Sequence, residues 1–330
     1  MAGMKQILPL DPATYQRHLI HGENRTWAET NCYTDVVIEL LHGLGHEPMA
    51  ALPFTLAIDF EGDQWTFFKF PQVDLLELYG FDIHELAPWR PLVEHIEEQV
   101  GMGRPVLVEL DSFFLPDTAG TAYKLAHVKS TVAVNAIDLQ ARRLGYFHNQ
   151  GYHALEGQDF VDVFQTGGLA HPRMLPPYIE FVKRLPHARP LSGAALVEAS
   201  VGLLRRHLGR IPERNPFPAF KAKFQADLDW LLQSDLEVFH AYSFATLRQY
   251  GACFELAGTC LGWLEGQGIG RLGAAREAFD QISQSTKAFQ FQLARSMARK
   301  RAFDLSPLDG MAEQWARATG GLLDDFGGSR

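Results

Sequence analysis

Strand-forming sequence ends at a proline-rich connector near the middle of the chain. Before the connector, short apolar or alternating runs recur, as is typical of β-strands, whereas after it the apolar residues follow helical spacing. The connector contains Pro172, Pro176, Pro177, Pro186 and Pro190. We therefore predict two domains, at residues 1–175 and 176–330. The hydrophobic content of 46% over 330 residues is sufficient for a core in each.

The first domain is predicted to be of the α+β class. Two aromatic-rich runs, Leu52–Phe60 and Gln64–Phe70, flank a Glu-Gly-Asp turn and indicate a hairpin. Core packing and a ligand pocket are alternative uses of their aromatic side chains. Further strands are predicted at Pro105–Asp111, in the middle of Tyr123–Asp138 and at Leu144–Phe147, and helices at Leu75–Tyr79 and Leu92–Val100.

The second domain is predicted to be a helical module. Ser192 and Ser306 are expected to cap helices, and Pro307 suits a first helical position. The segment Gly268–Gly273 matches G-x-G-x-x-G, but it follows a helix rather than a strand, so we interpret it as a turn between helices. The predicted helices are Ser192–Leu208, Pro218–Gln233, Leu236–Leu264, Leu272–Phe303 and Pro307–Phe326.

One helix of the first domain begins with a cysteine. Within Thr30–Gly45, six apolar residues recur at the spacing of one buried helical face, and Thr30 or Asn31 is suited to cap the start. Cys32 would then lie where unpaired backbone N–H groups and the helix dipole favour a thiolate. A buried structural cysteine is the alternative interpretation. The apolar residues are Tyr33, Val36, Val37, Leu40, Leu41 and Leu44.

A histidine and an asparagine follow Cys32 in an order that suits nucleophilic catalysis. His127 precedes a predicted strand and Asn149 follows the next one, which is the order found in papain-like enzymes. An imidazole there would take the thiol proton and return it to the leaving group, and a third group would fix the tautomer of the ring. His148 is the alternative to Asn149 as this third group.

Several segments resemble a known enzyme family. Asn31-Cys32, the helix ending at Gly45, the segment Leu110–Pro116 and the spacing of Tyr123 to His127 together resemble the BtrH-type papain-like acyltransferases over residues 25–165. The chain is also similar to an uncharacterised bacterial family encoded near carrier proteins and the ligases that load them with amino acids.

The resemblance implies a fold, a reaction and a set of site residues. The fold would be a papain-like cysteine-protease fold, with the Cys32 helix packed on an antiparallel sheet. The reaction would move an acyl or aminoacyl group from the phosphopantetheine thioester of a carrier protein, through Cys32, to an amine or similar acceptor. His127 would act as base and then acid, and Asn149 would orient it. No cofactor bound by the protein itself is expected.

Other residues are candidates for binding the substrate. The backbone N–H of Cys32, helped by Asn31, would stabilise the oxyanion. Asp111 and Tyr123 would contact substrate, although a strand-end aspartate also commonly caps the next turn. His148 is the remaining candidate for substrate binding.

Two other functions are compatible with the sequence. A cysteine peptidase or amidohydrolase would use the same residues with water as acceptor, and a non-catalytic scaffold protein of a biosynthetic complex would use none of them. No metal site is expected, because His42 and His46 are separated by helix-ending glycines and no other ligand set has a recognisable spacing.

Charge and composition limit the partners. The formal net charge of −9 argues against general binding to nucleic acid. No run is apolar enough to span a membrane and only three cysteines occur, so we expect a cytoplasmic protein with reduced thiols. Two arginine-rich clusters, Arg295–Arg301 and Arg205–Arg214, would suit an acidic carrier protein, or simply the C-terminal ends of their helices.

Overall fold

The computed structural model describes residues 3–29, 31–166 and 177–327. The chain divides into two compact units that are not contiguous in sequence. Unit 1 comprises Met1–Gly22, Asn31–Glu47 and Gln72–Pro190, and unit 2 comprises Glu23–Thr30, Pro48–Pro71 and Leu191–Arg330. The sequence-based boundary at residue 175 lies outside the described residues.

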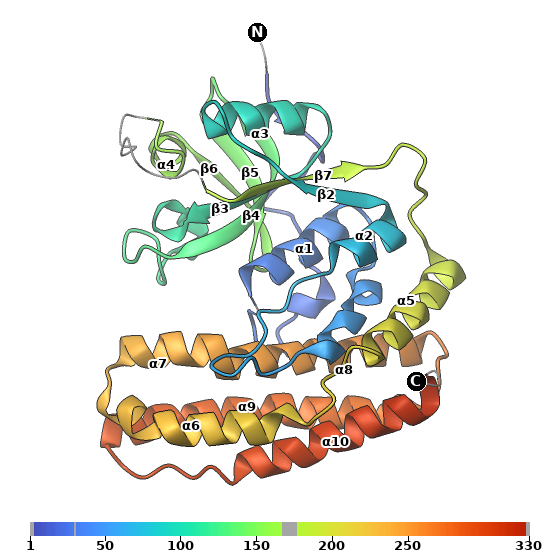
Figure 1. Ribbon diagram of the computed structural model, residues 1–330. Helices are drawn as coiled ribbons and strands as arrows, with labels where there is room; N and C mark the ends of the chain where they lie inside the picture. The colour runs from blue at the N-terminus through green and yellow to red at the C-terminus, as the bar shows by residue number, and fades with distance from the viewer. Residues whose placement is uncertain (1–2, 30, 167–176, 328–330) are drawn as a thin grey trace. The chain divides into compact units, whose positions relative to one another are not determined.

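Unit 1 is built on an antiparallel sheet, in agreement with the predicted α+β class. Its described strands pair in the order β2-β7-β3-β4-β5-β6, and β1 pairs with the end of β4. Helix α1 (Cys32–Gly43) packs against β4 and β5 on one face, and α3 (Leu92–Gly101) covers the other (Figure 1). The strands are β1 (Lys5–Gln6), β2 (Phe81–Glu85), β3 (Val106–Asp111), β4 (Lys129–Asp138), β5 (Arg143–His148), β6 (Gly151–Glu156) and β7 (Ile179–Arg184).

Alternation along the strands divides the sheet into two different faces. Val132 and Val134 of β4 belong to the hydrophobic core that contains the buried residues of α3 and of α4 (Gln158–Val163). Neighbouring residues of a strand point to opposite faces, so Lys129 and Thr131 lie on the face covered by α1. Helix α2 (Gln72–Tyr79) completes the unit beside β2.

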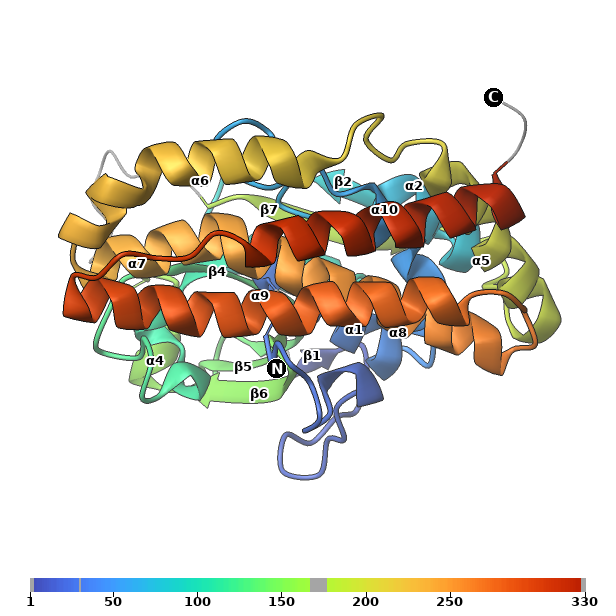
Figure 2. The ribbon, with the colours of Figure 1, turned by 90° about the horizontal axis from the view of Figure 1, so that it is seen from below.

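Unit 2 is helical in its C-terminal part, as predicted (Figure 2). An aromatic cluster forms part of its core: the ring of Trp65 lies 4.7 Å from that of Tyr250 and 5.2 Å from that of Phe217. The helices are α5 (Gly193–Leu208), α6 (Pro216–Gln233), α7 (Leu236–Ser243), α8 (Gln249–Gly266), α9 (Gly273–Arg299) and α10 (Pro307–Phe326).

The hairpin predicted around Gly62 is wrong. Residues Pro48–Ala57 form a 3₁₀ helix, and a single isolated bridge, Phe60 to Trp65, represents strand pairing among the described residues of this region. Pro48 and Pro53 cannot donate to a ladder, which explains the difference. The aromatic residues serve the core instead, since Trp65 is only 1% exposed.

Three further predictions need correction. The helix predicted over Leu236–Leu264 is interrupted by a π-helical turn at Phe244–Arg248. The side chains of Ser192 and Ser306 make no capping hydrogen bond. Strands β1, β2, β6 and β7 were not predicted.

No helix among the described residues is both long and apolar enough to cross a membrane.

Candidate functional site

Cys32 occupies the first position of α1, and Asn31 caps the helix. Asn31 has an extended backbone, with φ at −140°, and its side chain accepts a hydrogen bond from the backbone N–H of Thr34 at 2.8 Å. This cap leaves the N–H groups of the very first turn directed beyond the helix end. The Cys32 Sγ atom donates to Thr131 Oγ1 of β4 at 3.7 Å. The thiol is therefore held against the sheet face that α1 covers.

The other two cysteines have different surroundings. Cys253 is 0% and Cys260 2% exposed, and burial raises the pKa of both thiols above their ordinary value. Cys32 is half-buried. Of the three thiols, Cys32 is thus the accessible one.

A row of polar side chains extends from Thr131 along β3 and β4. Thr131 pairs with Glu109 across the two strands, and Lys129 pairs with Asp111 at the end of the ladder. Lys129 Nζ also forms an ion pair with Glu109 Oε1 at 2.7 Å. Alternation places these four side chains on the Cys32 face of the sheet. Of these four residues, only Asp111 was predicted as a site residue; alternation in both strands was the signal that could have identified the others.

His127 lies just before β4 and is paired with Asp111. Its Nδ1 atom is 2.6 Å from Asp111 Oδ2, and its ring stacks on Phe113 with centroids 4.3 Å apart and planes 11° from parallel. The side chain is 67% exposed. Asp111 also caps the following turn, because its Oδ1 accepts from the N–H of Phe113 at 3.0 Å. Asp111 therefore caps the turn, which was one of the two roles considered for it, and it also holds His127, which was not predicted.

Asn149 is not the partner of His127 in the structure. It lies in the tight turn between β5 and β6 with a φ of +47°, a left-handed conformation that asparagine tolerates well. Among the described residues, no hydrogen bond joins Asn149 to His127 or His127 to the Cys32 thiol. The structure thus brings together Asn31 with Cys32 and Asp111 with His127.

His148 belongs to a second polar network, buried on the opposite face of the sheet. Its Nε2 is 2.6 Å from Ser130 Oγ and its Nδ1 is 2.5 Å from Asp117 Oδ2, while the hydroxyl of Tyr146 donates to Asp117 Oδ1 at 2.5 Å. Burial alone would raise the pKa of Asp117, but the hydrogen bonds and charge of His148 and the bond from Tyr146 bring it below its ordinary value. Asp117 thus accepts from the Nδ1–H of His148, and the Nε2 atom of the same ring shares a hydrogen bond with the Ser130 hydroxyl.

Tyr123 is directed toward α4. Its hydroxyl donates to the carboxylate of Asp159 at 3.0 Å and 3.1 Å. Partial burial and the negative charge and hydrogen bond of Asp159 raise the pKa of Tyr123. The described contacts therefore join Tyr123 to α4 rather than to Cys32 or His127.

The comparison with protein families covers nearly the whole chain. The family model of the DUF1839 N-terminal domain matches residues 16–184, and the model of the DUF1839 C-terminal domain matches residues 193–324. The chain belongs to the DUF1839 family. No curated protein matches it.

The family domains and the structural units of this DUF1839 protein differ in one respect. Glu23–Thr30 and Pro48–Pro71 lie inside the N-terminal family domain but belong to unit 2. The first segment is held there by Trp27, whose ring N–H donates to Ser283 and whose backbone N–H donates to Glu255, both at 3.0 Å. Cys32 follows this segment directly along the chain.

Other histidines of the DUF1839 chain have structural partners. His42 Nε2 lies 3.0 Å from the carbonyl oxygen of Gln16, and His46 stacks on Tyr79. Among the described residues, no group of three or more His, Cys, Asp or Glu side chains is arranged to hold a metal ion.

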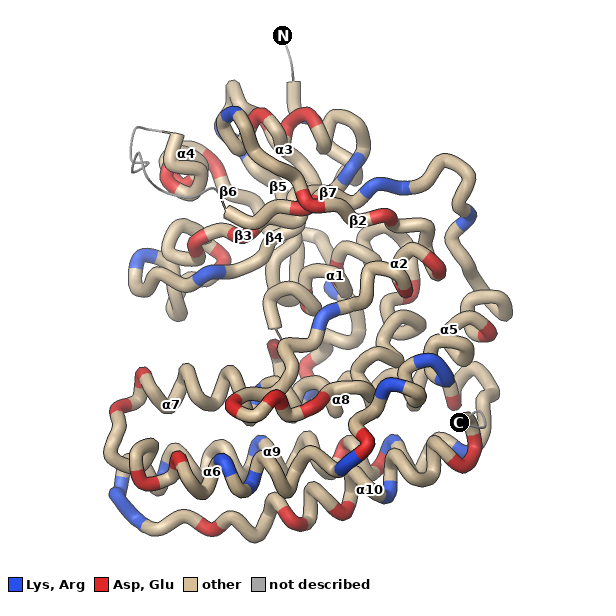
Figure 3. Tube along the Cα trace, in the orientation of Figure 1, with Lys and Arg blue, Asp and Glu red and all other residues tan. Residues whose placement is uncertain are grey.

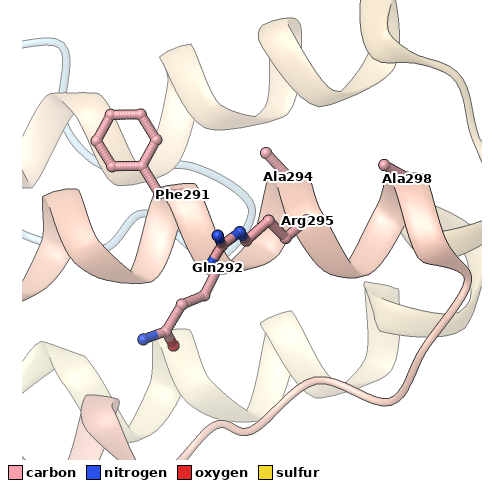
Figure 4. Close-up of a pocket in the computed structure, with 5 residues that line it drawn as sticks. All are labelled: Phe291, Gln292, Ala294, Arg295 and Ala298. Carbon is pink, nitrogen blue, oxygen red and sulfur yellow. The ribbon is translucent and has the colours of Figure 1, made fainter.

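Of the basic cluster at the end of α9, Arg295 lines a hollow. Phe291 and Arg295 border this hollow and project from consecutive turns of α9 (Figure 4). Unit 2 carries acidic as well as basic residues along its chain (Figure 3). Lys300 donates to the carbonyl oxygens of Leu232 and Ser234, so part of this charge serves the structure of the unit itself.

Proposed function

We propose that this DUF1839 protein is a cysteine-dependent acyltransferase with a papain-like catalytic unit. Cys32 would be the nucleophile, with an acyl or aminoacyl thioester of a carrier protein as donor and an amine as acceptor. The observation that carries the proposal is the 2.6 Å contact between His127 and Asp111, next to the strand residue that meets the Cys32 thiol. The nucleophile at the start of α1 therefore contacts β4, and the oriented base lies just before the same strand.

The Asp111 carboxylate prepares His127 for proton transfer. Its bond to Nδ1 leaves Nε2 as the atom that exchanges protons, which is the role an orienting carboxylate has in catalytic triads. In this proposal Asp111 takes the place of Asn149 as the third residue. The imidazole must leave Phe113 and turn toward Cys32 to take the thiol proton, and its 67% exposure leaves room for that movement.

The reaction consists of two balanced transfers. His127 Nε2 takes the Cys32 proton, the thiolate attacks the thioester carbonyl, and the donor thiol leaves with the proton from His127. The first-turn N–H groups of α1 stabilise the oxyanion. An amine then attacks the acyl-cysteine, loses its proton to His127 and releases Cys32. The phosphopantetheine arm is part of the donor substrate, and we place the reaction in the cytoplasm.

The decisive experiment is intact-mass analysis after mixing the full-length protein with an aminoacyl-loaded carrier protein. We expect an adduct on Cys32 in wild type and none in Cys32→Ala. Removal of the nucleophile should lower turnover by a factor on the order of 1,000 or more. Cys253→Ala is the matched control, because that thiol is buried and should leave the adduct unchanged. An adduct that persists in Cys32→Ala, or none in wild type, contradicts the proposal.

The role of His127 has its own test. Alkylation of Cys32 by iodoacetamide should slow about tenfold near neutral pH in His127→Asn, with its half-maximal rate moved to higher pH, because a base that shares the thiol proton is lost. Asn149→Ala should leave the pH profile unchanged. An unchanged profile in His127→Asn would remove His127 from the mechanism. Release of free acid rather than an amide product would instead identify a hydrolase.

A further inference from the structure

A polar cleft opens at the β5–β6 edge of unit 1, and the proposed acyl transfer makes no use of it. Its volume is about 570 Å³. The N-terminal segment 12–17 forms one wall, residues 150–154 form another, and Pro116 and Asp117 complete it. Cys32, Asp111 and His127 are absent from the described lining. The cleft is therefore separate from the acyl-transfer residues.

The cleft contains two opposite charges. Asp117 is an anion whose side chain is only 7% exposed and whose two oxygens are held by His148 and Tyr146. Because those donors favour the ionised form, the carboxylate keeps its charge near neutral pH. Arg17 is exposed, and its Nη1 donates to Gln150 Oε1 at 3.0 Å. A guanidinium has five N–H donors, so this one bond leaves others for a ligand.

The remaining walls suit a small organic molecule. The rings of Tyr15 and Tyr152 lie 5.9 Å apart and offer an apolar surface in the lining of the cleft. His153 also lines the cleft, and burial lowers its pKa, so at neutral pH its imidazole is an uncharged hydrogen-bonding group. A ligand would thus meet one cation, one anion, a neutral imidazole and two rings.

We propose that this cleft binds a small molecule with both an ammonium and a carboxylate group, of the amino-acid class. The ammonium would lie at Asp117 and the carboxylate at Arg17, where a guanidinium can donate two parallel hydrogen bonds. A ligand with only one of the two charges would leave the other protein charge without a partner, so the pair selects dipolar ions. The site is independent of the proposed acyl transfer.

The first measurement is the melting temperature of the full-length protein with each standard L-amino acid. At least one should raise it, because a ligand that binds only the folded state stabilises that state. Dissociation constants are then measured for the best amino acid, for its des-amino carboxylate and for its decarboxylated amine. We expect each half-molecule to bind about tenfold or more weakly than the amino acid.

Two variants separate the charges. Arg17→Gln should weaken the amino acid and the des-amino carboxylate about tenfold and leave the amine unchanged. Asp117→Asn should weaken the amino acid and the amine and leave the des-amino carboxylate unchanged. The melting temperature of this variant shows how much of its effect is structural. Gln150→Ala, which removes a neutral neighbour, should keep the order of the three affinities. The proposal is overturned if no amino acid at about 10 mM raises the melting temperature, or if Arg17→Gln weakens all three ligands equally.

Discussion

Unit 1 contains two sets that each combine a nucleophilic side chain, a histidine and an aspartate. The two sets differ in how exposed these side chains are. On the α1 face, Cys32 is half-buried and His127, held by Asp111, is 67% exposed, but the thiol and the imidazole are not bonded to each other. On the opposite face, Ser130, His148 and Asp117 are joined by hydrogen bonds of 2.6 Å and 2.5 Å.

The buried set has the hydrogen-bond order of a hydrolase triad, yet its serine and its imidazole lack the access that a substrate needs. His148 is 0% and Ser130 6% exposed, and neither lines a described pocket. Its physical effect is to tie the start of β4 to the end of β5 and to the 3₁₀ turn at Pro116–Thr118. The hydrogen-bonded set of Ser130, His148 and Asp117 is thus a structural network. The thiol and the imidazole of the other set are the ones exposed enough to react.

The sharpest test of this comparison replaces the aspartate of each set by asparagine, in two separate variants. Asp117→Asn should lower the free energy of unfolding by about 3–5 kcal/mol, because it leaves buried donors facing an uncharged group. Asp111→Asn keeps the turn cap and loses only an exposed pair, so its cost should stay below about 1 kcal/mol. Urea denaturation of both variants measures the difference. Equal losses would mean that the two networks are equally structural.

The sequence was informative where one periodicity dominated. The apolar spacing after Cys32 predicted α1, and the alternating run before Asp138 predicted β4. The order of the chemistry-bearing residues also indicated that Cys32 and His127 belong to one site, but pairing depends on register, which no local pattern specifies. Asp111 reaches His127 because it lies opposite Lys129 at the end of the ladder.

Two misses have specific physical causes. Pro48–Ala57 is buried on nearly every side, so its apolar run has no face and resembles a strand as much as a 3₁₀ helix. The Ser130 network joins residues 13, 18 and 31 positions apart, and the next residues of β4 on the same face, Val132 and Val134, belong to the apolar core. Only the folded sheet shows that the Ser130 hydroxyl faces His148.

A third imidazole extends the comparison to pH. His21 belongs to the 3₁₀ turn Leu19–His21 and is buried against α1. Its ring lies between two carboxylates of that helix, Asp35 at 3.2 Å and Glu39 at 2.5 Å. Burial lowers the pKa of His21, but the hydrogen bonds and charges of the two carboxylates outweigh it and raise the pKa to about 9.

A raised folded-state pKa stabilises the protein at low pH. The contribution of His21 is complete below its ordinary value near 6.5 and is lost as pH rises through about 9, a change of about 3 kcal/mol. His21→Gln should therefore show a flatter decline of unfolding free energy over this range than wild type. Tyr15 and His18 also adjoin Glu39, so Tyr15→Phe serves as the control that keeps the imidazole. Parallel curves for wild type and His21→Gln would show that His21 is uncharged when folded.

The smallest expected effect comes from the serine of the buried set. Ser130→Ala leaves the buried Nε2 atom of His148 without its hydrogen-bond partner, so the free energy of unfolding should fall by about 1–2 kcal/mol. Because the serine is a structural residue in this interpretation, alkylation of Cys32 and acyl transfer should stay within about twofold of wild type at temperatures where the variant is folded. Thr131→Val, at the next position on the opposite face of the sheet, is the matched control variant. It removes the hydroxyl that the Cys32 thiol contacts, so it should change the alkylation rate of Cys32 more than the free energy of unfolding. If Ser130→Ala abolished transfer while unfolding remained unchanged, the accessible and buried sets would have to exchange roles.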